Sequence, residues 1–80
     1  MEQTVLPLSE LRQGQRAKVM TMDLGGAIRR RVRELGLLPE TEVTCRYLAP
    51  AGTPAAYEIC GAVIALRRKD AEKVRVCLCG

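Results

Sequence analysis

Cysteine thiols are the side chains of this sequence with the strongest claim to metal chemistry. The chain has four of them, Cys45, Cys60, Cys77 and Cys79. Cys77 and Cys79 stand two residues apart in an apolar segment, so both thiols would point to the same face of a strand. Paired thiolates bind soft metals such as zinc or copper(I). Cys77 and Cys79 are therefore the candidate metal ligands of the chain.

A complete metal site needs more than this pair. Structural zinc usually has four Cys or His ligands, and the sequence contains no histidine. Cys45 alternates with Val43 and Tyr47, which is typical of a small core residue. Cys60 falls on a hairpin, where we expect it to be half exposed. We therefore expect free thiols in a reducing compartment and no cofactor held by the chain.

Catalysis lacks its usual residues. Ser9 is the only serine, and it is predicted to cap a short helix with no base near it in the sequence. The carboxylates stand singly among basic residues, as in solvated ion pairs. No glycine-rich loop leads into a helix with a phosphate-binding lysine. The sequence therefore predicts that the chain is not an enzyme.

A basic helix gives the clearest signal for an interaction. Ile28, Val32 and Leu35 recur at i, i+4 and i+7, which places them on one inward face. Gly36 is suited to the left-handed position after the helix, and Pro39 blocks its continuation. The outer face then displays the guanidinium groups of Arg29, Arg30 and Arg33.

Two further segments extend the predicted contact surface. Leu37 and Leu38 form a turn after the helix, and we expect one of them to fill the core while the other stays exposed. Pro50 and Pro54 delimit a stiff surface loop. The predicted partner-binding residues are Arg29, Arg30, Arg33, Leu37, Leu38, Pro50 and Pro54.

Short strands around this helix predict a mainly β fold. The strands are expected over residues 15–22, 42–48, 57–59, 62–67 and 74–78. Leu8 to Leu11 and residues 70–73 are predicted to form helical turns, and Asp23 to cap the basic helix. About five strands with one inserted helix and short helical turns make a small SH3-like barrel the expected architecture.

Alternation along these strands predicts which side chains enter the core. Ile64, Leu66, Val74, Val76 and Leu78 are expected to point inward. In the first strand Ala17, Val19 and Thr21 are expected to share one face, and in the second Val43, Cys45 and Tyr47 are expected to share one face. The opposite parity leaves Cys77 and Cys79 on the outer face of the last strand.

Size and charge restrict the function further. The 80 residues are expected to form one domain, residues 1–80, with little apolar material left over for a deep pocket. A net charge of +4 favours an acidic partner surface. The N-terminal residues lack the pattern of a secretory peptide, so we expect a cytoplasmic location. The longest apolar run, Ala62 to Leu66, is too short to span a bilayer, so membrane contact is expected only through a partner.

Four motifs, taken in order, give the chain a resemblance to a known family. They are Leu8-Ser9-Glu10-Leu11 with Gly14, Arg33-Glu34-Leu35-Gly36-Leu37-Leu38-Pro39, Ala49-Pro50 with Gly52 and Pro54, and Ile64-Ala65-Leu66-Arg67 with Ala71 and Val76. From Leu8 to Val76 the sequence resembles the FeoA family, the small cytosolic companions of the bacterial ferrous-iron transporter FeoB. The resemblance implies a non-enzymatic accessory domain that docks on the cytosolic part of FeoB and supports iron(II) uptake. It also associates the family with binding of transition-metal ions.

Three positions depart from the family pattern. Glu40 stands where the family has glycine after proline, which predicts a backbone there that suits an ordinary residue. Thr53 replaces the aspartate of a Gly-Asp-Pro turn and predicts a looser loop. Cys77 and Cys79 match no family motif.

Two alternatives from other classes remain open. A nucleic-acid-binding small barrel is permitted by the net charge, but two tyrosines as the only aromatic residues offer few platforms for stacking bases. A metal-sensing module would use Cys77 and Cys79. We expect the FeoB-type partner, no nucleic acid, and a monomer or a weak homodimer.

Overall fold

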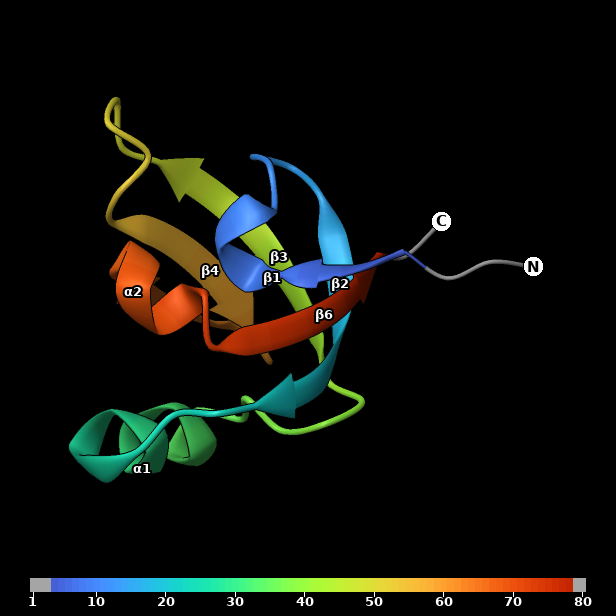
Figure 1. The fold of residues 1–80 in the computed structure, drawn as a ribbon, viewed down its shortest axis with the longest axis vertical. Coiled ribbons are helices and arrows are strands. Elements are labelled where there is room, and N and C mark those ends of the chain that lie inside the picture. The colour runs from blue at the N-terminus through green and yellow to red at the C-terminus, as the bar shows by residue number, and fades with distance from the viewer. Residues whose placement is uncertain (1–3, 79–80) are drawn as a thin grey trace.

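A six-stranded antiparallel sheet forms the body of the protein in the computed structural model, which describes residues 4–78 (Figure 1). The strands follow the order β1-β6-β2-β3-β4-β5 across the sheet. Along the chain the elements are β1 (Val5–Pro7), the 3-10 helix η1 (Leu8–Glu10), β2 (Arg16–Met22), α1 (Gly26–Glu34), β3 (Glu42–Leu48), β4 (Ala55–Ile59), β5 (Ala62–Leu66), α2 (Arg68–Ala71) and β6 (Val74–Leu78).

The sheet curls around a core of aliphatic side chains together with Cys45 and Tyr57. η1 contributes Leu8 to this core, and Leu11 follows it, both fully buried. The Tyr57 hydroxyl donates a hydrogen bond to the Leu8 backbone carbonyl at 3.3 Å. This bond ties η1 to the sheet and satisfies the one polar group that Tyr57 brings into the core.

All five predicted strands are present, and the mainly β fold with one inserted helix is confirmed. The sixth strand, β1, was not predicted because it is short and includes Pro7. Proline cannot donate to a β ladder, but it is tolerated in an edge strand. β1 is such a strand, since it pairs only with β6.

Two β-bulges interrupt the alternation that was predicted for β2 and β3. The register shifts between Val19 and Thr21, and again between Cys45 and Tyr47. Each extra residue turns the following side chains to the opposite face. Thr21 and Tyr47 are therefore exposed, and the prediction that they share a face with Val19 and Cys45, which are buried, was wrong. Their neighbours Met22 and Leu48 pack against the core instead.

The predicted helix caps were also wrong. α1 begins at Gly26 with Gly25 as its N-cap residue, and no side chain caps it, so Asp23 does not have that role. Ser9 lies inside η1, whose N-cap residue is Pro7. Glycine at positions 25 and 26 thus permits the chain to enter the helix without a side-chain cap.

The second helical turn lies earlier than residues 70–73, at Arg68–Ala71. Its first backbone N–H, that of Arg68, donates to Thr53 Oγ1 at 3.1 Å. The Arg68 guanidinium also contacts the Ala51 carbonyl oxygen at 3.5 Å. Thr53 therefore fastens its loop to α2, contrary to the looser loop predicted for this residue.

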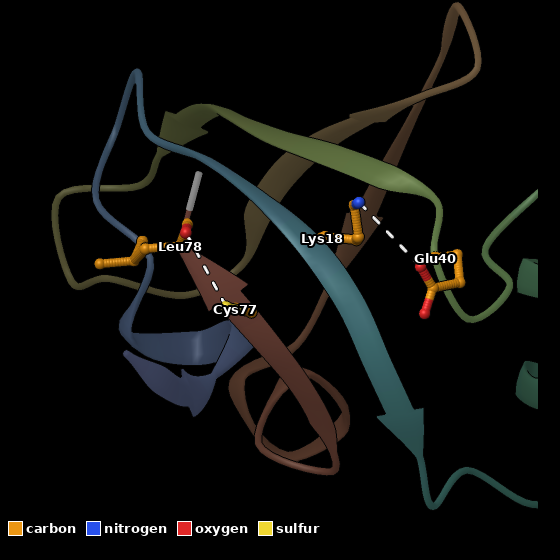
Figure 2. A network of polar contacts seen from close by, with 4 residues as sticks. All are labelled: Lys18, Glu40, Cys77 and Leu78. Carbon is orange, nitrogen blue, oxygen red and sulfur yellow. Dashed lines mark hydrogen bonds and ion pairs between the residues drawn. The ribbon is translucent and has the colours of Figure 1, made fainter. Parts of the chain in front are cut away.

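Glu40 adopts a left-handed backbone, with φ at +76°. The prediction of a backbone suited to an ordinary residue was wrong, because tertiary hydrogen bonds fix this conformation. The Glu40 N–H donates to the Val19 carbonyl at 2.8 Å, and Val19 N–H donates to the Thr41 carbonyl at 2.9 Å. Figure 2 shows the Glu40 carboxylate facing Lys18, with 4.0 Å between the charged atoms. Both side chains are exposed, so this ion pair adds little stability.

We expect Glu40→Gly to stabilise the protein by about 0.5–1 kcal/mol. Glycine relieves the left-handed strain of about 1–2 kcal/mol, and its extra entropy in the unfolded chain offsets part of that gain. Urea unfolding of the two proteins measures the difference. Glu40→Ala is the matched control, because it removes the carboxylate but keeps a Cβ. Equal stabilities of the glycine and alanine variants would contradict the assignment of strain to this residue.

Candidate protein-interaction surface

α1 lies at one end of the molecule (Figure 1). Val32 is fully buried, and Ile28 and Leu35 pack against the core from the same side of the helix. These are the three residues that the sequence predicts to face inward. The opposite face of α1 is left exposed.

No helix among residues 4–78 is long and apolar enough to cross a membrane.

The C-terminal end of α1 sets the positions of the two leucines. Gly36 has φ at +103°, and its N–H donates to the Arg33 carbonyl, while Leu37 N–H donates to the Val32 carbonyl at 2.8 Å. This bonding pattern is a Schellman motif, which normally brings the side chains of its first and last residues together. Leu37 is accordingly buried beside Val32, and the reversed chain leaves Leu38 42% exposed.

Arginine side chains and Leu38 line an open groove of about 550 Å³ on the outer face of α1. The lining residues are Gly26, Arg29, Arg30, Arg33, Glu34 and Leu38. Four of the seven residues predicted to bind a partner therefore lie together. Glu34 was not predicted, although its position four residues after Arg30 places it on the same helix face.

The groove keeps its positive charge. Among residues 4–78 the ion pairs lie elsewhere, between Arg16 and Glu42, Lys18 and Glu40, and Arg46 and Glu58. No carboxylate within residues 4–78 forms an ion pair with the α1 guanidinium groups, and the single carboxylate of Glu34 leaves the three arginines of the groove in excess. Guanidinium binds carboxylates in a bidentate geometry, and Leu38 adds an apolar contact next to them. This chemistry suits an acidic protein segment that carries an apolar side chain.

The other predicted contact residues do not join the groove. Pro50 and Pro54 are exposed in the β3–β4 loop, which lies at the opposite end of the longest axis from α1 (Figure 1). The extent along that axis is 36 Å. Leu37 is fully buried and offers no surface, so its assignment to the contact surface was wrong. The turn directs the Leu37 side chain into the core, so that of the two leucines only Leu38 is exposed for contact with a partner.

The cysteines are dispersed. Cys45 is buried in the core and Cys60 is exposed on the β4–β5 turn, as predicted. Burial raises the pKa of the Cys45 thiol, which disfavours the thiolate that a metal would need. Within residues 4–78, no three Cys, Asp or Glu side chains are grouped so as to hold a metal ion.

The predicted exposed thiol pair on β6 is not observed. Cys79 lies outside the described residues, and Cys77 is only 9% exposed. β6 lies between β1 and β2, and Val5 and Lys18 stand directly opposite Cys77 on these strands. Neighbouring strands on both sides bury a side chain that a single strand would expose. Figure 2 shows the Cys77 thiol contacting the Leu78 carbonyl oxygen, at 3.9 Å.

Gly36→Ala is expected to destabilise the protein by about 1–3 kcal/mol, since an alanine would need a strained backbone there. The new Cβ would also lie 2.9 Å from Cys60 Sγ. Gly14→Ala is the matched control, because Gly14 has a similar φ of +89° but open space around the added atom. Thermal unfolding should show a larger loss for Gly36→Ala, and Cys60→Ala should recover the difference. Equal losses at the two glycines would show that the contact with Cys60 is unimportant.

Comparison with known proteins identifies the family. A family model, the FeoA domain, matches residues 6–77. A fusion protein of Fe(2+) transport protein A and the Fe(2+) transporter FeoB from Porphyromonas gingivalis is 35% identical over 69 residues. That alignment covers 86% of this chain but only 8% of the length of the fusion protein.

Solved structures of FeoA proteins have the same fold. The solution structure of FeoA from Chlorobium tepidum superposes with a TM-score of 0.88 at 33% identity, covering 94% of this chain and 71% of that one. The crystal structure of Stenotrophomonas maltophilia FeoA complexed with zinc, described as an SH3 domain protein, gives 0.72 at 37% identity, with 86% of each chain covered. The predicted SH3-like barrel is thereby confirmed. The chain belongs to the FeoA family, a family of small accessory domains involved in ferrous-iron transport.

Proposed function

We propose that this chain is a non-enzymatic accessory domain of ferrous-iron uptake that docks on the cytosolic part of a FeoB-type transporter. The Porphyromonas gingivalis relative supports this, because it carries FeoA and FeoB in one fused chain. Covalent fusion gives two domains a high effective concentration for each other. A separate FeoA chain would need a surface with affinity of its own.

The groove on α1 is the observation that carries the proposal. Arg29, Arg30 and Arg33 project into it without ion-pair partners among residues 4–78, and Leu38 lies beside them. In the complex, these guanidinium groups bind carboxylates of the transporter, and Leu38 packs against an apolar side chain at the centre of the contact. Arginine next to an apolar anchor is typical of the energetically dominant part of protein interfaces.

Pro50 and Pro54 form a second, separate contact candidate at the far end of the molecule. The proposal also retains the predicted organisation of residues 1–80 as one domain, the cytoplasmic location, and membrane contact through the transporter alone. Iron is the cargo of the transporter in this scheme, and this chain holds no cofactor.

Affinity capture tests the class of partner. Immobilised protein is incubated with detergent-solubilised membranes that contain FeoB of the same organism, and with total nucleic acid from the same cells. We expect retention of FeoB at physiological salt and no retained nucleic acid. Retention of RNA or DNA without FeoB, lost on Arg29→Glu and Arg30→Glu, would instead assign the basic groove to nucleic-acid binding.

A further inference from the structure

The β4–β5 hairpin ends the sheet with an unpaired strand. β5 pairs with β4 and, within residues 4–78, with no other strand. The opposite edge strand, β1, is only three residues long and includes Pro7. Short edges and proline are devices that prevent further strands from adding to a sheet. β5 has five residues and no proline.

The hairpin turn determines which backbone groups of β5 face the open edge. Cys60 and Gly61 have φ at +51° and +82°, which is the signature of a two-residue type I′ turn. The flanking pair, Ile59 and Ala62, is then hydrogen-bonded across the hairpin. Because hydrogen-bonded and non-bonded pairs alternate, the N–H and C=O groups of Val63 and Ala65 point away from β4. Within residues 4–78 these four groups have no hydrogen-bond partner, so they can pair with an added strand.

The side chains at this edge are apolar. Val63 is 62% exposed, and Ala65 is also exposed. Ala65 lies directly opposite Ala56, which lies opposite Tyr47, itself 54% exposed. An aromatic ring and three small apolar side chains therefore lie on the outer face next to the open edge, together with Glu58, which stands opposite Val63 and is ion-paired with Arg46 at 2.8 Å. Residues 62–66 carry no charge that would repel another strand.

We propose that β5 pairs antiparallel with β5 of a second copy of this chain, forming a weak homodimer with a continuous sheet. The two-fold axis passes beside Ile64, so that Val63 of each copy lies opposite Ala65 of the other. Each such pair exchanges two N–H···O=C hydrogen bonds, and the four outward groups of each strand are all used. A two-fold interface requires one patch to be complementary to itself, and this edge meets that requirement.

Charge favours this arrangement over other alignments of the same strands. Arg67, Arg68 and Lys69 directly follow β5. In the proposed register, Arg67 lies opposite Gly61 of the second copy, and the two Arg67 residues are separated by the length of the paired strands, about 20 Å. That separation exceeds the Debye length of about 8 Å at physiological ionic strength. A parallel pairing would place the basic segments side by side.

The dimer is weak because the contact is small. A pair of five-residue strands with one row of side chains falls below the size of a standard protein interface, about 1,600 Å². None of the residues that line the α1 groove takes part, so dimerisation leaves that groove free. The inference therefore stands independently of the proposed docking on FeoB.

Sedimentation equilibrium over a wide range of protein concentration, combined with amide hydrogen exchange followed by NMR, tests the proposal. We expect a monomer–dimer equilibrium. Within β5, the amides of Val63 and Ala65 should exchange more slowly at high protein concentration than at low concentration. The Ile64 amide is already bonded to β4 and should not change. A monomer at every concentration, or a dimer that leaves Val63 and Ala65 exchange unchanged, would overturn the proposal.

Charge variants test the register. Val63→Lys with Ala65→Lys places lysines opposite each other in both pairs, and we expect the dimer dissociation constant to rise at least about tenfold. Val63→Lys with Ala65→Glu places opposite charges in the same pairs, keeps a lysine opposite Glu58 as in the first variant, and should dimerise at least as well as the wild type. Both changes are at exposed positions, and equal melting temperatures at low concentration verify folding. Equal weakening by the two variants would exclude this register.

Discussion

Replacing Leu66 with alanine is expected to destabilise the domain by about 2–5 kcal/mol, the largest effect that we predict for a single substitution. Leu66 is 2% exposed and lies on β5 opposite Ala55, another buried residue. The core contains no Phe or Trp side chain that could move into the cavity. A loss of this size is a large fraction of the stability of a small domain.

Chemical denaturation of the wild type and of Leu66→Ala measures this loss. Val63→Ala is the matched control on the same strand, because Val63 faces solvent and surface substitutions usually change stability by about 0.5 kcal/mol or less. If Leu66→Ala unfolded at the same denaturant concentration as the wild type, Leu66 would have to lie outside the core.

The second large effect is a loss of stability in alkaline solution. Burial of the hydroxyl, with a smaller contribution from the charge of Cys45, raises the pKa of Tyr57 from 10.0 to about 12. Between these values the folded protein keeps a proton that the unfolded chain has lost. The contribution of protonated Tyr57 to the free energy of unfolding is therefore fully present below pH 10. It is lost as the pH rises toward 12, which lowers the free energy of unfolding by on the order of 2–3 kcal/mol. The raised pKa of Cys45 acts in the same direction.

Urea unfolding at a series of pH values from neutral to strongly alkaline measures this decrease. Tyr57→Phe should be less stable than the wild type at neutral pH, since it loses the hydrogen bond to Leu8, but should lose less further stability in the alkaline range. Tyr47→Phe is the matched control at an exposed position and should retain the wild-type decrease. A Tyr57→Phe variant with the full alkaline decrease would show that another group causes it.

Local sequence patterns predicted the elements well because each depends on neighbouring residues. Alternation in Val74 to Leu78 and the i, i+4, i+7 spacing in α1 directly express strand and helix geometry. The Schellman turn followed from Gly36, and with it the burial of one leucine and the exposure of the other. The arginines and one exposed leucine of the groove could therefore be predicted from the sequence, whereas which of the two leucines stays exposed depended on the geometry of the turn.

Features that depend on pairing between distant strands could not be predicted. The bulges near Met20 and Arg46 reverse the faces of the residues after them, and nothing in the local alternation marks them. Cys77 is buried because strands on both sides flank it. The left-handed backbone of Glu40 is fixed by its hydrogen bond to Val19, more than twenty positions earlier in the chain. A single strand or turn contains no information about such neighbours.

Docking on FeoB through the α1 groove is tested most directly by the affinity of this chain for the purified cytosolic part of the transporter. Two double variants with the same net charge are compared with the wild type: Arg29→Glu with Arg30→Glu in the groove, and Arg12→Glu with Arg75→Glu at exposed positions outside it. We predict that the groove variant raises the dissociation constant at least about tenfold more than the control variant, since only the groove arginines lose direct contacts with transporter carboxylates. Equal affinities of the two double variants would contradict the groove as the docking surface, and absence of binding by the wild type would contradict docking on this part of FeoB.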